Sequence, residues 1–159
     1  MTNSSILHSW MKNENAITNW LYVHEEELID IAQYVWEHPE TAYEEKLSSK
    51  CLGTYLEKQG FTVEWGTAGI ETAFSAKCGT GRPYIGFLAE YDALAEIGHA
   101  CGHNLFGTAV IGAACALREE LKEGTIFVYG CPAEEILSGK IFMNNEGVFD
   151  DLDLAVTWH

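Results

Sequence analysis

Two histidines and a cysteine stand within five residues of one another in the segment Gly98-His-Ala-Cys-Gly-His-Asn104. Thiolate and imidazole groups are ligands that zinc-like ions prefer in proteins. A cysteine directly before a helix has its thiolate favoured by the positive end of the helix dipole, so Cys101 suits a metal ligand or a bridge between two ions. The spacing equally fits a buried thiol and a hydrogen-bonded histidine in a tight turn. It also leaves open whether His99 or His103 would bind.

An acidic element follows in Cys131-Pro-Ala-Glu-Glu135, and the sequence closes on His159. Neighbouring carboxylates at the end of a strand point in different directions. One of Glu134 and Glu135 can therefore bind a metal ion, while the other takes a proton from water and delivers it to a leaving amine. The alternative is an exposed acidic pair at the start of a helix. Together with the first segment, these residues indicate a metal-dependent hydrolase.

The hydrophobic pattern of the chain indicates the elements that must position these side chains. Helices are expected at 16–37, 43–59, 105–122 and 139–146, with Asn104 as the N-cap of the third. Strands are expected at 61–65, 70–77, 84–88, 125–129 and 152–157. From residue 84 the order is β-α-β-α-β. This order predicts an α/β fold with an open, mostly parallel sheet and helices on both faces.

The predicted strands bring the candidate residues to one place. In open α/β sheets, ligands bind beyond the carboxyl ends of the strands. Asp92 follows the strand at 84–88, the two glutamates follow the strand at 125–129, and His159 follows the last strand. We therefore expect all of them at the same edge of the sheet. Asp92 there either orients a metal ligand through a hydrogen bond or caps a turn.

Composition limits the kinds of partner and compartment. With 9 basic and 24 acidic residues, the formal charge of −15 argues against nucleic acid or an anionic membrane as a partner. The five cysteines are odd in number and form no CxxC pair, which favours a reducing compartment over a disulfide framework. No signal-peptide pattern and no apolar run of membrane-spanning length is present, so we expect one cytoplasmic domain.

Four motifs stand in order along nearly the whole chain from about residue 20. They are Trp36-Glu-His-Pro-Glu-Thr-Ala-Tyr-Glu-Glu45, Ala89-Glu-Tyr-Asp-Ala-Leu94, Gly98–Asn104 with the following Leu-Phe-Gly-Thr-Ala109, and Pro132-Ala-Glu-Glu135. This set resembles the aminoacylase/carboxypeptidase superfamily of dinuclear metallohydrolases, and within it the amidohydrolase branch. The sequence departs from that pattern at Ala95, where a proline is common, and at Ile136-Leu-Ser-Gly139, where a glycine-rich run is usual.

The resemblance implies two divalent ions, zinc or manganese, as cofactors. It implies Cys101 as the bridge between them, His103 and His159 as further ligands of one ion, and Glu135 as a ligand of the other. Glu134 would be the general base and Asp92 the supporting aspartate. The implied reaction is hydrolysis of an N-acyl or N-aroyl amino-acid amide bond, in a p-aminobenzoyl-glutamate-like conjugate, a related conjugate or a small peptide.

The resemblance also sets an expectation for the extent of the domain. Family members continue beyond the position of His159 into a lid and dimerisation domain and then into the rest of the catalytic domain. Residues 1–159 are therefore expected to form the N-terminal part of a catalytic domain, from a protein that forms homodimers. The alternative function is a truncated, non-catalytic metal-binding fragment of such an enzyme.

Overall fold

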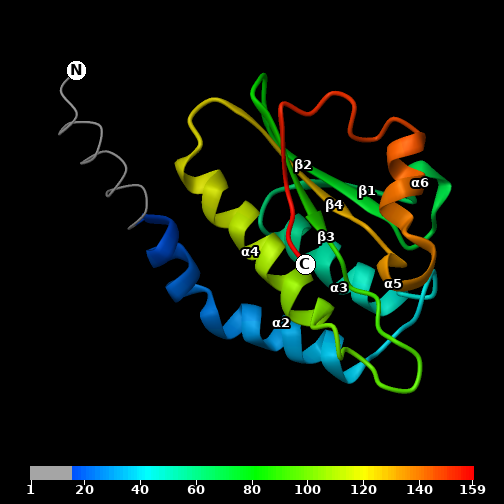
Figure 1. Cartoon of the computed structure of the whole chain (residues 1–159). Coiled ribbons are helices and arrows are strands. Elements are labelled where there is room, and N and C mark those ends of the chain that lie inside the picture. The colour runs from blue at the N-terminus through cyan, green and yellow to red at the C-terminus, as the bar shows by residue number, and fades with distance from the viewer. Residues whose placement is uncertain (1–15) are drawn as a thin grey trace.

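A five-stranded mixed sheet organises the computed structural model, which describes residues 16–159 (Figure 1). In chain order its strands are β1 Thr62–Trp65, β2 Phe74–Thr80, β3 Tyr84–Ala89, β4 Gly124–Gly130 and β5 Leu154–Val156, and their order across the sheet is β1-β2-β4-β3-β5. β3 pairs in parallel with β4 and β5, whereas β2 pairs antiparallel with β1 and β4. The prediction of an open α/β sheet is confirmed. Parallel pairing is confined to β3, β4 and β5. Helices connect these strands, and parallel neighbours need such a long connection.

Helices cover both faces of the sheet, as expected. They are α2 Glu25–Glu37, α3 Lys46–Lys58, α4 His103–Glu120, α5 Glu134–Leu137 and α6 Gly139–Asn145, with a short 3-10 turn η1 Thr67–Gly69. Residues 16–23 are also helical, and the expected helix at 16–37 is interrupted at His24. Val128 packs in the larger core with α2, α3 and α4, whereas its neighbour Tyr129 packs in the smaller core with Met143 of α6. Successive strand residues point to opposite faces, so the two cores lie on opposite sides of the sheet.

The helix that carries the histidine segment begins earlier than expected. α4 starts at His103, and Gly102 precedes it in the left-handed conformation at φ 81°. The prediction of Asn104 as the N-cap is therefore wrong. Asn104 lies inside the first turn, where its side-chain amide donates a hydrogen bond to the carbonyl oxygen of Ala32, at 3.2 Å. The left-handed glycine lets the chain enter the helix at once, without a side-chain cap.

The segment before α3 joins the N-terminal helices to the end of β3. Both carboxylate oxygens of Glu40 accept hydrogen bonds from the first turn of α3, from the backbone N–H of Leu47 at 3.0 Å and of Ser48 at 2.9 Å. These bonds satisfy N–H groups that have no partner within the helix. The carbonyl oxygen of Glu40 also accepts the N–H of Ala93, at 2.8 Å. The loop after β3 is thereby fixed against the entry to α3.

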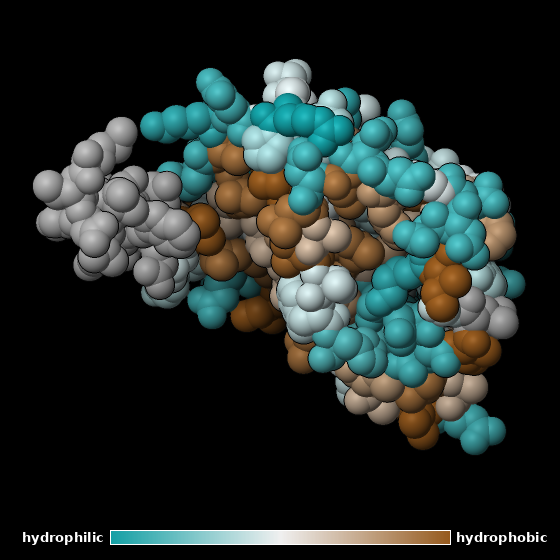
Figure 2. Space-filling model, turned by 45° about the horizontal axis from the view of Figure 1, so that its top comes forward, coloured by the Kyte–Doolittle hydropathy of each residue, from teal (hydrophilic) through white to brown (hydrophobic). Residues whose placement is uncertain are grey.

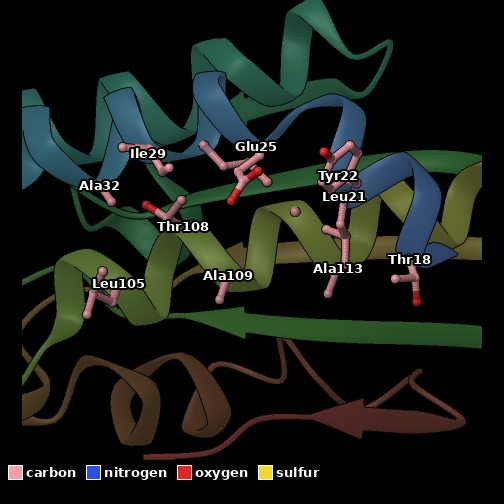
Figure 3. Close-up of a pocket in the computed structure, with 12 residues that line it drawn as sticks. Thr18, Leu21, Tyr22, Glu25, Ile29, Ala32, Leu105, Thr108, Ala109 and Ala113 are labelled. Carbon is pink, nitrogen blue, oxygen red and sulfur yellow. The ribbon is translucent and has the colours of Figure 1, made fainter.

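An apolar groove runs between α4 and the two N-terminal helical segments. It is an open cavity of about 520 Å³, lined by Leu21, Ile29, Leu105, Ala109 and Ala113 among others (Figure 3). Hydrophobic surface is also visible between hydrophilic borders on the face shown in Figure 2. Within residues 16–159, no helix has both the length and the apolar character needed to span a membrane.

Candidate metal centre

The carboxyl ends of the three parallel strands meet, as the sequence predicts. Ligand atoms of Glu90, after β3, of His103 in α4, of Glu134 in α5 and of His159, after β5, all lie within 4.8 Å of one another. The Nε2 atoms of His103 and His159 are 3.1 Å apart. Glu90 Oε2 lies 3.2 Å from His103 Nε2, and Glu134 Oε2 lies 3.5 Å from His159 Nε2. We call these four side chains the metal cluster.

The orientation of His103 is fixed by Asp92. His103 Nδ1 lies 3.0 Å from the backbone carbonyl oxygen of Asp92 and 3.0 Å from its Oδ1. Both partners are acceptors, so Nδ1 carries the hydrogen and donates it. In the neutral ring, Nε2 then presents a lone pair to the cluster. This is the arrangement in which a carboxylate holds a metal-binding imidazole.

Asp92 also reaches the acidic element. Its Oδ2 accepts the backbone N–H of Glu135, at 3.1 Å. Burial alone would raise the pKa of Asp92, but the hydrogen bonds from His103 and from the backbone outweigh burial and lower it. Burial likewise opposes the charged form of His103, yet the hydrogen bond and charge of Asp92 raise the pKa of His103 overall. The two groups thus stabilise each other's charged forms.

Glu90 joins the cluster, although no pattern in the sequence favours it over Asp92. It is fully buried, and burial raises its pKa despite the nearby Lys140. Lys140 Nζ donates to Oε1 of Glu90, whereas Oε2 faces His103 and has no hydrogen-bond partner. One feature of the sequence could have indicated Glu90: it directly follows a strand with a buried pattern and stands two residues before Asp92. Side chains two apart in an extended segment point to the same side, so both can reach the site.

Cys101 and Glu135 lie beside the cluster rather than inside the four-atom group. Cys101 is exposed, and Glu135 Oε1 lies 3.5 Å from His103 Nε2. The hydrogen bond to the Glu135 carboxylate, followed by desolvation and neighbouring acidic charges, raises the pKa of Cys101 to about 11. The sequence-based expectation of a favoured thiolate is thus not met, because nearby carboxylates outweigh the helix dipole. A bound cation would reverse that balance.

His99 is not brought into the four-atom group. It is buried, its ring centroid lies 6.5 Å from that of Trp36, and neither ring nitrogen has a hydrogen-bond partner. Of the two histidines that spacing left undecided, His103 is therefore the one whose nitrogen meets His159 and the carboxylates.

The donor set suits a divalent metal ion. Two imidazole nitrogens bound to one tetrahedral zinc ion at about 2.0–2.1 Å lie roughly 3.3 Å apart, close to the observed separation of the two Nε2 atoms. Two buried carboxylate oxygens, Glu90 Oε2 and Glu135 Oε1, have no hydrogen-bond partner and face His103. Imidazole and carboxylate groups together suit zinc and manganese. An open cavity of about 320 Å³, lined by Cys101, Phe106 and His159 among others, adjoins the cluster and gives it room for a ligand.

Comparison with known proteins identifies relatives. No protein-family model matches the sequence. The chain is 48% identical to a p-aminobenzoyl-glutamate hydrolase of Escherichia coli, in a match that covers 82% of this chain and 31% of that protein. It is 36% identical to the human Xaa-Arg dipeptidase, over 84% of this chain and 35% of the dipeptidase. The chain thus spans about a third of the length of these curated relatives.

Solved structures support the same relationship. A dinuclear metal-binding peptidase of the M20 family from Bacillus subtilis superimposes with a TM-score of 0.74 and 25% identity, covering 84% of this chain and 42% of that one. The aminobenzoyl-glutamate utilization protein of Klebsiella pneumoniae shares the fold, with a TM-score of 0.72, 19% identity, and coverage of 87% and 44%. This chain therefore has the fold of the matching part of these two proteins, which is 42% of the M20-family peptidase.

Proposed function

We propose that this chain, a homologue of M20-family amidohydrolases and peptidases over about a third of their length, supplies the metal-binding part of an amidohydrolase. The observation that carries the proposal is the convergence of Glu90, His103, Glu134 and His159 at the carboxyl ends of three parallel strands. Glu90 is buried beside Glu134, and without a bound cation these two like charges would lie close together at a cost. A divalent ion removes that cost.

The names of two relatives support a proposal for the substrate class. One is named a hydrolase of p-aminobenzoyl-glutamate and another a dipeptidase of Xaa-Arg. Both names describe cleavage of an amide bond to an amino acid. We therefore propose an N-acyl or N-aroyl amino-acid amide, or a small peptide, as the substrate.

Each side chain then has a role that its position supports. A divalent ion at the cluster supplies Lewis acidity to water and to the scissile carbonyl group. Glu134 Oε2 lies at the edge of the cluster on a partly exposed side chain, so it can take a proton from water and pass it to the leaving nitrogen. Asp92 holds His103 through Nδ1. Lys140 balances the charge of Glu90.

A second ion would use the neighbouring residues. Cys101 and Glu135 lie next to each other, and Glu135 Oε1 is 3.5 Å from His103 Nε2. A solved relative of the M20 family is a dinuclear metal-binding peptidase. We therefore propose two zinc or manganese ions, and Cys101 and Glu135 would help to hold the second one beside the cluster. Zinc stoichiometry tests this assignment: we expect two ions per chain, and one for Cys101→Ser.

The general base is tested with Glu134→Gln. The amide cannot accept the proton, so turnover of p-aminobenzoyl-glutamate should fall by about 10²–10⁴-fold while zinc remains bound. Glu123→Gln, on an exposed glutamate outside the site, is the matched control. Full turnover by Glu134→Gln would show that another group is the base.

The second candidate function is a metal-binding fragment without catalytic activity. The metal cluster is compatible with it, because binding of an ion does not require turnover. Under this alternative the 159-residue chain binds zinc but hydrolyses no amide, so Glu134→Gln has no turnover to lower. Turnover by the purified chain would exclude it.

A further inference from the structure

The buried carboxylate of Glu45 contacts the loop that carries Glu134 and Glu135, although Glu45 is distant from that loop in the sequence. Glu45 directly precedes α3 and is fully buried. Its Oε1 accepts the backbone N–H of Ala133, at 2.9 Å, across 88 residues of sequence. Burial raises the pKa of Glu45, and the groups that oppose this rise are backbone N–H groups and the Thr72 hydroxyl rather than a cation.

The residue held by Glu45 has an uncommon backbone conformation. Ala133 lies in the left-handed region at φ 57° and ψ 40°, which residues with a Cβ atom rarely adopt. It directly precedes Glu134, the first residue of α5. The turn at Ala133 therefore sets the direction in which the chain leaves β4. That direction decides where the carboxylates of Glu134 and Glu135 point.

The other side of Glu134 is held in the same way. Asp92 Oδ2 accepts the N–H of Glu135, at 3.1 Å. Glu134 thus lies between two residues whose backbone N–H groups each donate to a buried carboxylate. Asp92 acts from the end of β3, and Glu45 acts from the entry to α3.

We propose that Glu45 is a positioning residue for the metal cluster: by holding the N–H of Ala133, it fixes the left-handed turn that directs Glu134 and Glu135 toward His103. This inference rests on the proposed function, since it assumes that the cluster binds a metal ion. Glu45 does not touch the ion or the substrate. A carboxylate is suited to the task because a charged acceptor makes a stronger hydrogen bond to a backbone N–H than a neutral one does.

The test is the zinc dissociation constant of the folded chain, measured by competition with a chromophoric chelator. Glu45→Ala removes the acceptor, so the dissociation constant should rise by about 10–100-fold, as for other residues that hold a ligand in place. Glu45→Gln keeps an acceptor oxygen on a side chain of the same length and should restore most of the affinity. Glu44→Ala, on the exposed neighbouring residue, is the matched control and should bind like the wild type.

A second substitution keeps the test decisive if Glu45→Ala does not fold. Glu45→Asp retains the charge but withdraws the oxygens from Ala133, so it should weaken zinc binding where Glu45→Gln does not. A purely structural role would lower the unfolding temperature of these variants and leave the dissociation constant of the folded chain unchanged, and that result would overturn the inference. Failure of the wild-type chain to bind zinc would instead contradict the proposed function, and this inference with it.

Discussion

His103 is the residue on which the site depends, because its two ring nitrogens have separate tasks. Nδ1 is held by Asp92 and Nε2 faces His159, Glu90 and Glu135. Residue types and spacing predicted that the histidine segment and the acidic pair would be neighbours, but they did not favour His103 over His99. They could not identify Glu90 as a neighbour of the same nitrogen, since that contact depends on how far the chain after β3 stays extended.

The support from Asp92 leads to the first prediction. Asp92→Ala removes the acceptor for His103 Nδ1 and for the Glu135 N–H, so the zinc dissociation constant should rise by about 10–100-fold. Asp92→Asn retains one acceptor oxygen, so its zinc affinity should fall less than that of Asp92→Ala. Asp30→Ala, on an exposed residue of α2, is the control for competition titrations. If the zinc affinity of Asp92→Ala were unchanged, Asp92 would only cap a turn and would not orient His103 for metal binding.

At the scale of elements, the close contact of α4 with the end of β3 sets the distance between His103 and Glu90. Gly107 permits this contact, because a Cβ atom there would lie 2.5 Å from the carbonyl oxygen of Glu90 and 3.1 Å from Leu52 Cδ1. The backbone oxygen cannot rotate away as a side chain can. The helix and the strand would have to separate.

Gly107→Ala is therefore expected to act on stability and on the site together. Overpacking of this kind destabilises a domain by about 1–3 kcal/mol, which urea unfolding would detect. The shift of α4 should also weaken zinc binding by the folded chain. Ala109→Ser adds one atom at an exposed position of the same helix and should change neither quantity. Wild-type stability in Gly107→Ala would mean that the contact between α4 and β3 adapts easily.

The last strand is held at its start by Asp153. Its Oδ2 accepts the N–H of Tyr84, at 2.7 Å, its Oδ1 accepts a bond from Arg82, at 2.5 Å, and its own N–H donates to Tyr84 O, at 2.9 Å. These bonds join β5 to β3 and so help to place His159. The hydrogen bond from Tyr84 lowers the pKa of Asp153 below its ordinary value of 3.8.

A lowered pKa in the folded state fixes the sign of the pH dependence. The stabilisation from Asp153 is fully present above pH 3.8 and is lost as the pH falls through the lowered pKa. Asp153→Asn should therefore be less stable than the wild type near neutral pH, and the difference should close in acid. Urea midpoints measured against pH would show this, with Asp151→Asn as an exposed control. A constant difference at all pH values would contradict it.

At the scale of the whole molecule, the sequence predicted the sheet, both helical layers and the meeting of three strand ends. It predicted less of the antiparallel half, because short strands such as β1 pair according to their connections rather than their residue types. Glu45 was also beyond sequence reasoning. Its contact with Ala133 joins positions 88 residues apart and depends on a left-handed backbone conformation that alanine does not signal.

Because the molecule is acidic, binding of a metal ion should affect the stability of the whole fold. The net charge is −15, and Glu90, Asp92, Glu134 and Glu135 lie close together at one edge of the sheet. Zinc at about 100 times its dissociation constant should stabilise the chain by about 2.7 kcal/mol, because only the folded state brings the ligands together. The unfolding temperature should therefore rise with zinc and return after chelation. If the unfolding temperature were the same with and without zinc, the folded chain would not form the proposed metal site.

The function proposed for the molecule depends on the binding of a divalent ion by the cluster at the strand ends. Anomalous diffraction at the zinc edge, from crystals of the chain grown with zinc, locates such an ion without reference to activity. We expect a peak between His103 Nε2 and His159 Nε2, in contact with the carboxylate of Glu90. Zinc bound only elsewhere on the acidic surface, or no peak between the two imidazoles at saturating zinc, would contradict the assignment of this cluster as a metal site.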